Sequence, residues 1–179
     1  LFNIALLLAL TIFFATYPFR DLKRLTSHKV LVGVTIGAVG ILVMLNPLTL
    51  YEGVIFDSRT ILLTVSGMVF GLLPTAIGAA MMAIYRLMIG GGGIYTGLTT
   101  ILLSSVIGVW WHHKRYQKVL KKHELFGLEY YLMGVITHVG MLLAMLLMPS
   151  DIRRTVVAVM AFPVLVIYPV GTYLLSLLL

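Results

Sequence analysis

Apolar segments long enough to cross a lipid bilayer make up most of this sequence. A transmembrane helix needs about 20 predominantly apolar residues, and runs near that length occupy residues 1–17, 30–45, 95–111, 126–148 and 155–179. Only 11% of the 179 residues are charged, whereas a soluble domain carries about 25%. Because so little polar surface is available to face water, the sequence predicts an all-α, polytopic membrane helix bundle.

Residues 59–89 form an apolar stretch that does not fit a single span. As one helix its 31 residues would extend about 46 Å, against about 30 Å for the hydrocarbon core of a bilayer. Gly71 and Pro74 lie at its middle, where a proline breaks or kinks a helix. We therefore expect five full spans plus a broken helical hairpin over residues 59–89, which turns near Pro74 and either crosses the bilayer or re-enters it part-way.

The basic residues predict how the bundle is oriented. Nine of the thirteen Lys and Arg lie within residues 20–29 and 112–124, and short basic loops of membrane proteins face the cytoplasm. Residues 46–58 contain Glu52 and Asp57 but no Lys or Arg. The N-terminus and a run of four glycines at residues 90–93 are therefore predicted to lie outside, and the C-terminus in the cytoplasm.

The composition also bears on function. The net charge of +7 comes from the two basic loops and does not indicate a nucleic-acid partner. The chain has no Cys, which excludes disulfides and thiolate metal sites, and it shows no nucleophile–base pair, phosphate loop or metal-spaced carboxylate cluster. We expect no metal, no cofactor and no enzyme activity within these residues. Since the chain starts and stops inside apolar runs, we expect a single domain, residues 1–179, cut from a longer protein.

Two arginines indicate where a ligand would bind. Arg59 and Arg86 mark the outer ends of the broken hairpin and should come near the same membrane face. An ionisable residue at an embedded position indicates a functional site, and Arg binds a carboxylate through two parallel hydrogen bonds. The glycine run offers unobstructed backbone N–H groups, and the helix after it directs its N-terminus toward the same region. The candidate ligand-binding residues are Asp57, Arg59, Tyr85, Arg86, Gly91, Gly92, Gly93, Tyr95, Thr96, Thr99 and Thr100.

A structural reading of the same arginines is the alternative. Arg59 would extend to the lipid headgroups and pair with Asp57, and Arg86 would cap the second helix of the hairpin. On the ligand-site reading, the threonines donate hydroxyl hydrogen bonds, and Tyr85 and Tyr95 form an aromatic wall. Both readings are open from the residues alone.

Other small and polar residues are predicted to serve packing. Gly33, Gly37 and Gly40 recur on the span over residues 30–45, and such spacing lets helix backbones approach closely in lipid. His138 stands alone on an apolar helix, and we expect it to be a hydrogen-bonded packing residue.

A set of these residues, in this order, resembles the LytS/YhcK-type five-transmembrane receptor family over nearly the whole chain. The residues that carry the resemblance are Asn46-Pro47, Phe56-Asp57-Ser58-Arg59, Ser66-Gly67, Phe70-Gly71, Pro74, Tyr85-Arg86, the glycine run at 90–93 and Gly97. The resemblance implies a sensor domain of the bacterial inner membrane, followed by a cytoplasmic histidine kinase or diguanylate cyclase, and hence two-component or cyclic-di-GMP signalling. It also implies a pyruvate-like carboxylate ligand, with Arg59 and Arg86 as the paired arginines. Where some members have Cys and Ser after the glycine-rich loop, this chain has Gly97 and Thr100.

The leading hypothesis is a sensory input domain that binds a small anion from the outer face, in a full-length protein that forms a homodimer. A transporter subunit similar to the substrate-binding components of vitamin importers is the alternative, since broken helices around a small-molecule site are a transporter device. We find no second, inverted copy of the hairpin, which counts against a two-repeat transporter. A purely structural membrane anchor would leave Arg59 and Arg86 unexplained.

Overall fold

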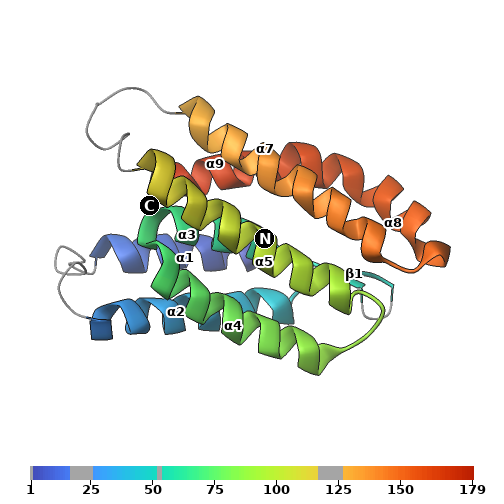
Figure 1. Ribbon diagram of the computed structural model, residues 1–179, viewed down its shortest axis with the longest axis horizontal. Coiled ribbons are helices and arrows are strands. Elements are labelled where there is room, and N and C mark those ends of the chain that lie inside the picture. The colour runs from blue at the N-terminus through green and yellow to red at the C-terminus, as the bar shows by residue number, and fades with distance from the viewer. Residues whose placement is uncertain (1, 17–25, 52–53, 117–126) are drawn as a thin grey trace.

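The computed structural model describes residues 2–16, 26–51, 54–116 and 127–179, which form a helix bundle with one small β-hairpin (Figure 1). The α-helices are α1 (Phe2–Thr16), α2 (Thr26–Leu45), α3 (Arg59–Phe70), α4 (Leu72–Ile89), α5 (Ile94–Trp111), α7 (Gly127–Ala144), α8 (Ser150–Phe162) and α9 (Tyr168–Leu178). Three short segments continue or join them: the π-helices η2 (His112–Tyr116) and η4 (Pro163–Ile167) and the 3-10 helix η3 (Met145–Leu147). Strands β1 (Leu48–Tyr51) and β2 (Val54–Phe56) pair antiparallel, with Leu48 opposite Phe56.

The predicted polytopic helix bundle is confirmed. Within the described residues, five helical stretches are long and apolar enough to cross a membrane: Thr26–Leu45, Leu72–Ile89, Ile94–Lys114, Gly127–Leu147 and Ser150–Leu178. Four of them coincide with predicted spans. The fifth is α4, the second arm of the hairpin, whereas α1 at the predicted first span has 15 residues. The β-hairpin between α2 and α3 was not expected from the sequence.

The predicted break in residues 59–89 is confirmed, and it lies at Gly71. This residue has φ 75° and ψ −162°, a conformation that is essentially restricted to glycine. Pro74 follows in the first turn of α4, where the missing N–H of a proline leaves no intrahelical hydrogen bond unmade. The turn therefore comes three residues before the predicted position, because the glycine conformation, and not the proline, ends α3.

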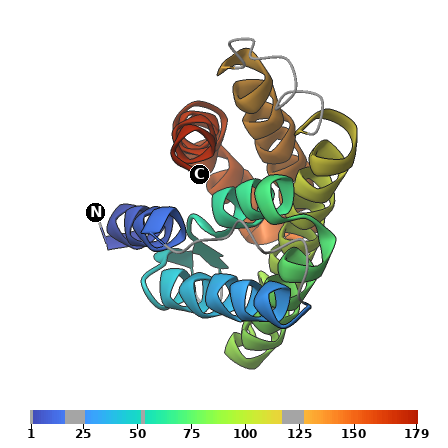
Figure 2. The same cartoon turned by 90° about the vertical axis from the view of Figure 1, so that its left-hand side faces the viewer.

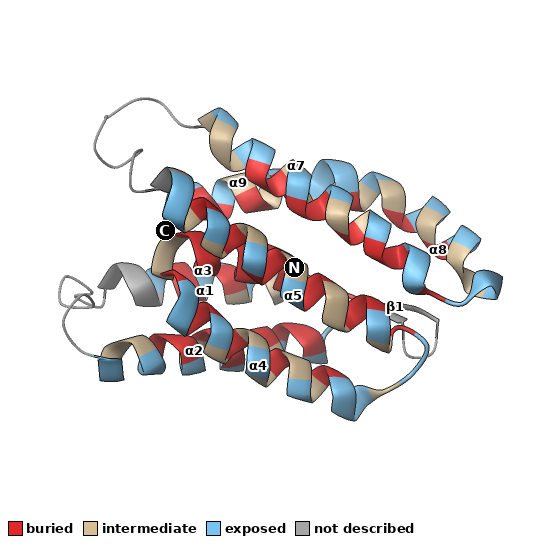
Figure 3. Cartoon of the chain, viewed as in Figure 1, coloured by how far each residue is buried: buried red, intermediate tan, exposed pale blue. Residues whose placement is uncertain are grey.

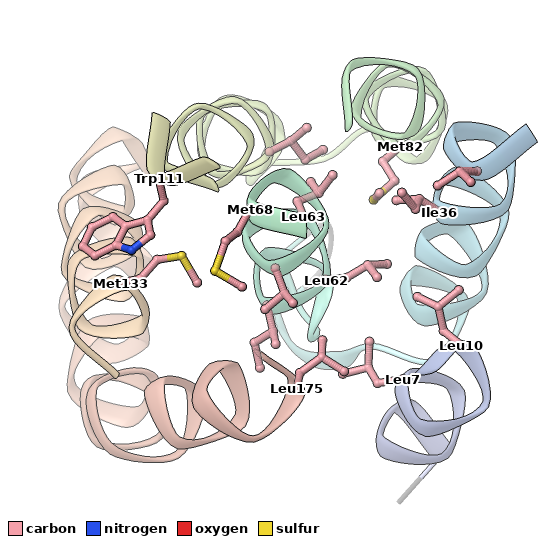
Figure 4. Packing of buried hydrophobic residues seen from close by; sticks show 14 of the residues in the cluster. Leu7, Leu10, Ile36, Leu62, Leu63, Met68, Met82, Trp111, Met133 and Leu175 are labelled. Atoms are coloured by element: carbon pink, nitrogen blue, oxygen red, sulfur yellow. The ribbon is translucent and has the colours of Figure 1, made fainter. Parts of the chain in front are cut away.

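The first arm of the hairpin, α3, lies at the centre of the bundle (Figure 2). Ten of its 12 residues are buried, and it packs against α2, α4, α5, α7 and α9. Figure 4 shows Leu62 and Leu63 directed toward Ile36 of α2 and Met82 of α4, with Met68 on the side of Met133 of α7. At 1.5 Å per residue α3 extends about 18 Å, less than the hydrocarbon core of about 30 Å, while the 18 residues of α4 have the length of a full span.

Close helix approaches depend on glycine, as predicted for α2. A Cβ on Gly33 would lie 2.8 Å from both the Pro74 carbonyl oxygen and Ile77 Cβ of α4. Gly108 of α5 performs the same role toward α3, since a Cβ there would overlap the carbonyl oxygen of Thr64. Small residues of this kind let backbones pack in lipid, where no hydrophobic effect drives helices together.

The distribution of polar and apolar side chains is that of a membrane bundle (Figure 3). Large apolar residues cover the outside: Met88, Leu102 and Phe162 are 77%, 66% and 68% exposed. Polar side chains are instead buried within the bundle, with Thr64 and His138 fully buried and Arg86 at 1% exposure. A lipid-facing surface explains the exposed apolar residues. The buried polar groups indicate that a ligand-binding site would lie inside the bundle.

The two ends of the bundle carry different elements (Figure 1). The start of α2, the end of η2, the start of α7 and the C-terminus lie at one end. The β-hairpin, the end of α4, the start of α5 and the start of α8 lie at the other. Most of the predicted basic loops, residues 20–29 and 112–124, fall outside the described residues. The arrangement matches the predicted order of crossings, and the cytoplasmic location of the first end stays a prediction from those basic loops.

Candidate anion-binding site

Asp57 and Arg59 form a buried ion pair where β2 leads into α3. Asp57 Oδ1 accepts a hydrogen bond from the backbone N–H of Arg59 at 2.9 Å, so the carboxylate satisfies one of the free N–H groups at the beginning of α3. The other oxygen, Oδ2, lies 3.5 Å from Arg59 Nη1. The two residues are 4% and 5% exposed. The predicted pairing with Asp57 is thus present, but the Arg59 side chain is buried inside the bundle instead of extending outward.

Arg86 approaches from the last turns of α4. Its Nη1 donates to the carbonyl oxygen of Gly90 at 2.9 Å, which caps the C-terminal end of that helix, as the structural reading expected. The rest of the side chain lies over Gly97 on α5: a Cβ at this position would be 3.0 Å from Arg86 Cδ and would overlap Nε. Gly97 lines the same cavity as Arg59, so the contact with Gly97 brings Arg86 next to that cavity.

A small cavity lies between Arg59 and the beginning of α5. Its volume is about 20 Å³, which is room for about one water molecule. The lining residues come from four parts of the chain: Phe56, Arg59, Gly93, Thr96, Gly97, Thr100, Met141 and Met148. The cavity therefore has a polar side made by α3 and α5 and an apolar side made by Phe56 and the two methionines.

Several polar atoms around this cavity have no hydrogen-bond partner among the described residues. They are Arg59 Nη1, Asp57 Oδ2 and Thr96 Oγ1. A buried polar atom left unpaired costs about 1–3 kcal/mol, so such atoms call for a bound water, an ion or a ligand. Thr100 differs, because its hydroxyl already donates to the Gly97 carbonyl oxygen at 2.9 Å. Of these two threonines, Thr96 is therefore the one whose hydroxyl can donate a hydrogen bond to a ligand.

The structure brings together part of the predicted residue set. Arg59, Gly93, Thr96 and Thr100 line the cavity directly. Asp57 joins them through its ion pair, and Arg86 through its contact with Gly97.

The remaining candidates lie elsewhere. Tyr95 is 74% exposed and Tyr85 packs against the main apolar core, so the predicted aromatic wall does not form beside the cavity. Gly91 and Gly92 are exposed, and Thr99 is half-buried without contributing to the lining. Thr100 follows Thr96 by about one helical turn, so the two side chains are about 40° apart around α5, whereas Thr99 is about 100° away from Thr100.

Met141 and Met148 are site residues that the sequence did not reveal. They come from α7 and from the segment after η3, more than 80 residues beyond Arg59. Apolar residues surround both methionines in the sequence, so periodicity does not tell which of these side chains turns inward. Gly97, in contrast, could be identified from the sequence, since it belongs to the residues that carry the family resemblance.

A second polar contact joins α3 to the later helices. His138 Nδ1 lies 2.7 Å from the Gly134 carbonyl oxygen, so this nitrogen carries the proton, and Nε2 accepts the hydroxyl of Thr60 at 3.3 Å. The imidazole also packs edge-on against Tyr168 at the start of α9, with 5.2 Å between ring centroids. The expectation that His138 is a hydrogen-bonded packing residue is confirmed. Through it, the helix that begins with Arg59 contacts the last span.

The fold and the buried arginines are those of a multi-pass membrane domain with an internal polar site. Residues 12–179 match the family model described as 5TMR of 5TMR-LYT, and the chain belongs to this family of five-transmembrane receptor domains. It is therefore a transmembrane sensory input domain of signalling proteins and a non-catalytic membrane domain. No curated protein and no solved structure shows significant similarity to the chain.

Proposed function

We propose that this domain is the input module of a bacterial signalling protein, a histidine kinase or a diguanylate cyclase of the inner membrane, and that it binds a small carboxylate from its outer face. One observation carries the proposal. The guanidinium of Arg59, 5% exposed, lines an internal cavity together with the unpartnered hydroxyl of Thr96. A carboxylate is the group that two such donors fit, because both offer N–H or O–H bonds to one anionic centre.

The start of α5 adds to the attraction for an anion. Gly93 precedes this helix and Thr96 lies in its first turn, where backbone N–H groups and the helix dipole favour negative charge. Phe56, Met141 and Met148 form the opposite wall, so a ligand with one carboxylate and a short apolar part matches the lining. A carboxylate ligand is larger than this volume of about 20 Å³, so its binding requires the walls of the cavity to move apart.

The contact between Thr60 and His138 suggests how ligand binding is transmitted from α3 to the C-terminal helix. A ligand that pulls on Arg59 displaces the beginning of α3, and Thr60 is the next residue along. His138 then transmits the displacement to Tyr168 and α9, which leads to the C-terminus and the proposed cytoplasmic output module. A signal requires that the ligand binds one arrangement of these helices more tightly than the other. In the full-length protein this output would operate as a homodimer.

A transporter subunit is the second candidate, supported by the broken pair α3 and α4 next to the cavity. Membership of a receptor-domain family favours the sensor. The two functions differ in one measurable property, since a transporter subunit moves labelled carboxylate across a sealed vesicle and a sensor does not.

The first experiment is a thermal-shift screen of the purified domain in detergent. Small carboxylates, phosphates and neutral metabolites are compared, because a ligand that binds only the folded state raises the melting temperature with concentration. We expect a shift from a carboxylate that is lost in Arg59→Ala and also in the charge-neutral pair Asp57→Asn with Arg59→Gln. Arg153→Ala is the matched control, since Arg153 lies near the start of α8 and its side chain donates to the Leu146 carbonyl oxygen. A carboxylate shift of equal size in Arg59→Ala would contradict the proposal.

A further inference from the structure

A groove of about 540 Å³ runs between α4 and α5, two helices that lie side by side (Figure 1). Its volume lies within the range of about 300–1,000 Å³ that is usual for ligand pockets. Its lining is apolar except for Thr75 and Ser105. Their hydroxyls donate to the carbonyl oxygens of Gly71 and Ile101, one turn earlier on the chain. The groove therefore directs no hydrogen-bond donor at an occupant, and hydrocarbon is the chemistry that it fits.

Four alanines of α4 make room for the groove. Ala76, Ala79, Ala80 and Ala83 all line it and have the spacing of residues on a single helix face. Ala76 and Ala80 are exposed, as is Leu102 on the side of α5. The groove is thus open to the surrounding bilayer, and no large side chain of α4 fills it.

The groove has about the length of one leaflet. It follows α4 from Leu72 to Ala83, which is about 17 Å. It follows α5 from Leu98 to Trp110, which is about 18 Å. One leaflet contributes about 15 Å to a hydrocarbon core of about 30 Å. An acyl chain that lies parallel to the helices matches both the length and the chemistry of the groove.

Basic residues follow at one end of the groove. Lys114 comes four residues after Trp110, about one helical turn further along, and is exposed. Residues 112–124 contain five Lys and Arg against one Glu, so this segment is basic in total. Trp110 itself is half exposed, as is typical of tryptophan at a lipid–water interface. Basic residues beside transmembrane helices attract the headgroups of anionic lipids.

We propose that the groove between α4 and α5 is a binding site for an anionic phospholipid. One acyl chain lies in the groove, and Lys114 binds the phosphate of the headgroup. The lipid fills the space that the four alanines leave and holds α4 and α5 at their distance from one another. This site is separate from the cavity beside Arg59, since the two have no lining residue in common.

The experiment measures lipid binding to the purified domain in detergent by native mass spectrometry. Dioleoyl phosphatidylglycerol and dioleoyl phosphatidylcholine are compared, because they share acyl chains and differ in the charge of the headgroup. We expect one phosphatidylglycerol to bind about fivefold more tightly than phosphatidylcholine, since one Lys contributes about that factor to the binding of an anionic lipid. Glycerol phosphate, a headgroup without acyl chains, should not bind detectably.

Two variants separate the two parts of the site. Lys114→Gln should bind both lipids equally, whereas Arg154→Gln, the same loss of charge at an exposed position of α8, should keep the fivefold preference. Ala80→Phe fills the groove and should weaken the binding of both lipids by about tenfold or more. Ala158→Phe, at an exposed position of α8, is its control and should bind as the wild type does.

Four results would overturn the proposal. Equal affinity of the wild type for the two lipids removes the headgroup contact. Undiminished binding in Ala80→Phe places the lipid outside the groove. A dimer that forms in lipid-free detergent and is lost in Ala80→Phe means that a second copy of the chain covers the groove. If Ala80→Phe does not fold, Lys114→Gln decides, because a preserved preference for phosphatidylglycerol contradicts the site.

Discussion

The side chain of Arg86 on α4 lies directly across Gly97 on α5, in the space that any Cβ at position 97 would occupy. This contact places the second arginine beside the cavity wall formed by Thr96 and Thr100. It also explains why a glycine stands in the second turn of α5, where a larger residue would otherwise form a better helix.

Gly97→Ala is therefore expected to destabilise the domain by about 1–3 kcal/mol, because the methyl group forces Arg86 out of place. The free energy of unfolding in detergent measures this effect. Gly92→Ala is the control, since its Cβ would meet only Pro149 Cγ at 3.9 Å. An equal loss in both variants would show that the cost of Gly97→Ala does not come from displacing Arg86.

Thr96→Val should weaken carboxylate binding by about tenfold or more, because a hydrogen bond to a charged group contributes about 1.5–3 kcal/mol. The valine keeps the shape of the side chain and removes a hydroxyl that has no partner among the described residues, so stability should not fall. Calorimetric titration with propionate measures the change. Thr99→Val, on another face of the same helix, should bind as the wild type does, and unchanged binding in Thr96→Val would remove this hydroxyl from the site.

Thr60→Val should separate binding from signalling. The variant leaves His138 Nε2 without its hydroxyl donor. Because this nitrogen is fully buried, the free energy of unfolding should fall by about 1–3 kcal/mol. Ligand affinity should stay near the wild-type value while the response of the full-length output activity to ligand declines. Thr35→Val is the control, because its hydroxyl bonds only to the Leu31 carbonyl oxygen on its own helix. A full response in Thr60→Val would mean that the signal does not pass through His138.

Gly71→Ala should destabilise the turn between α3 and α4. The backbone angles at Gly71 cost a residue with a Cβ about 1–3 kcal/mol, and a Cβ there would also lie 3.2 Å from the His112 ring. Thermal unfolding of the purified domain measures the loss. Leu72→Ala, at the adjacent exposed position, provides the comparison, and the prediction is wrong if the two variants unfold alike.

The orientation can be tested with single cysteines, because these 179 residues contain none. Gly92→Cys, in the loop after α4, should react with a membrane-impermeant thiol reagent added to intact cells. Lys114→Cys, in η2 at the end of α5, should react only after the cells are opened. The reverse pattern would place the proposed ligand site on the cytoplasmic side.

The sequence predicted the helix bundle and the interruption in residues 59–89 because both follow from composition and length. It placed the turn near Pro74 but did not identify Gly71 as the residue that ends α3, since both residues interrupt helices and only the backbone angles decide between them. It identified Arg59 and Arg86 because charges in an apolar stretch stand out. It did not identify Met141 or Met148, because apolar residues on an apolar helix carry no mark of the face that turns inward.

The shortness of α3 has a consequence for how the protein is made. A helix of 12 residues that begins with Arg59 is too short and too polar at its start to enter a bilayer as an independent unit. Three of the helices that enclose it, α5, α7 and α9, come later in the chain. We therefore expect α3 to stay near the membrane surface, or beside α2 and α4, until the C-terminal helices have been inserted. Truncation before α9 should leave α3 accessible to protease, so a helix that begins more than 100 residues after Arg59 completes the membrane insertion of the first residues of the site.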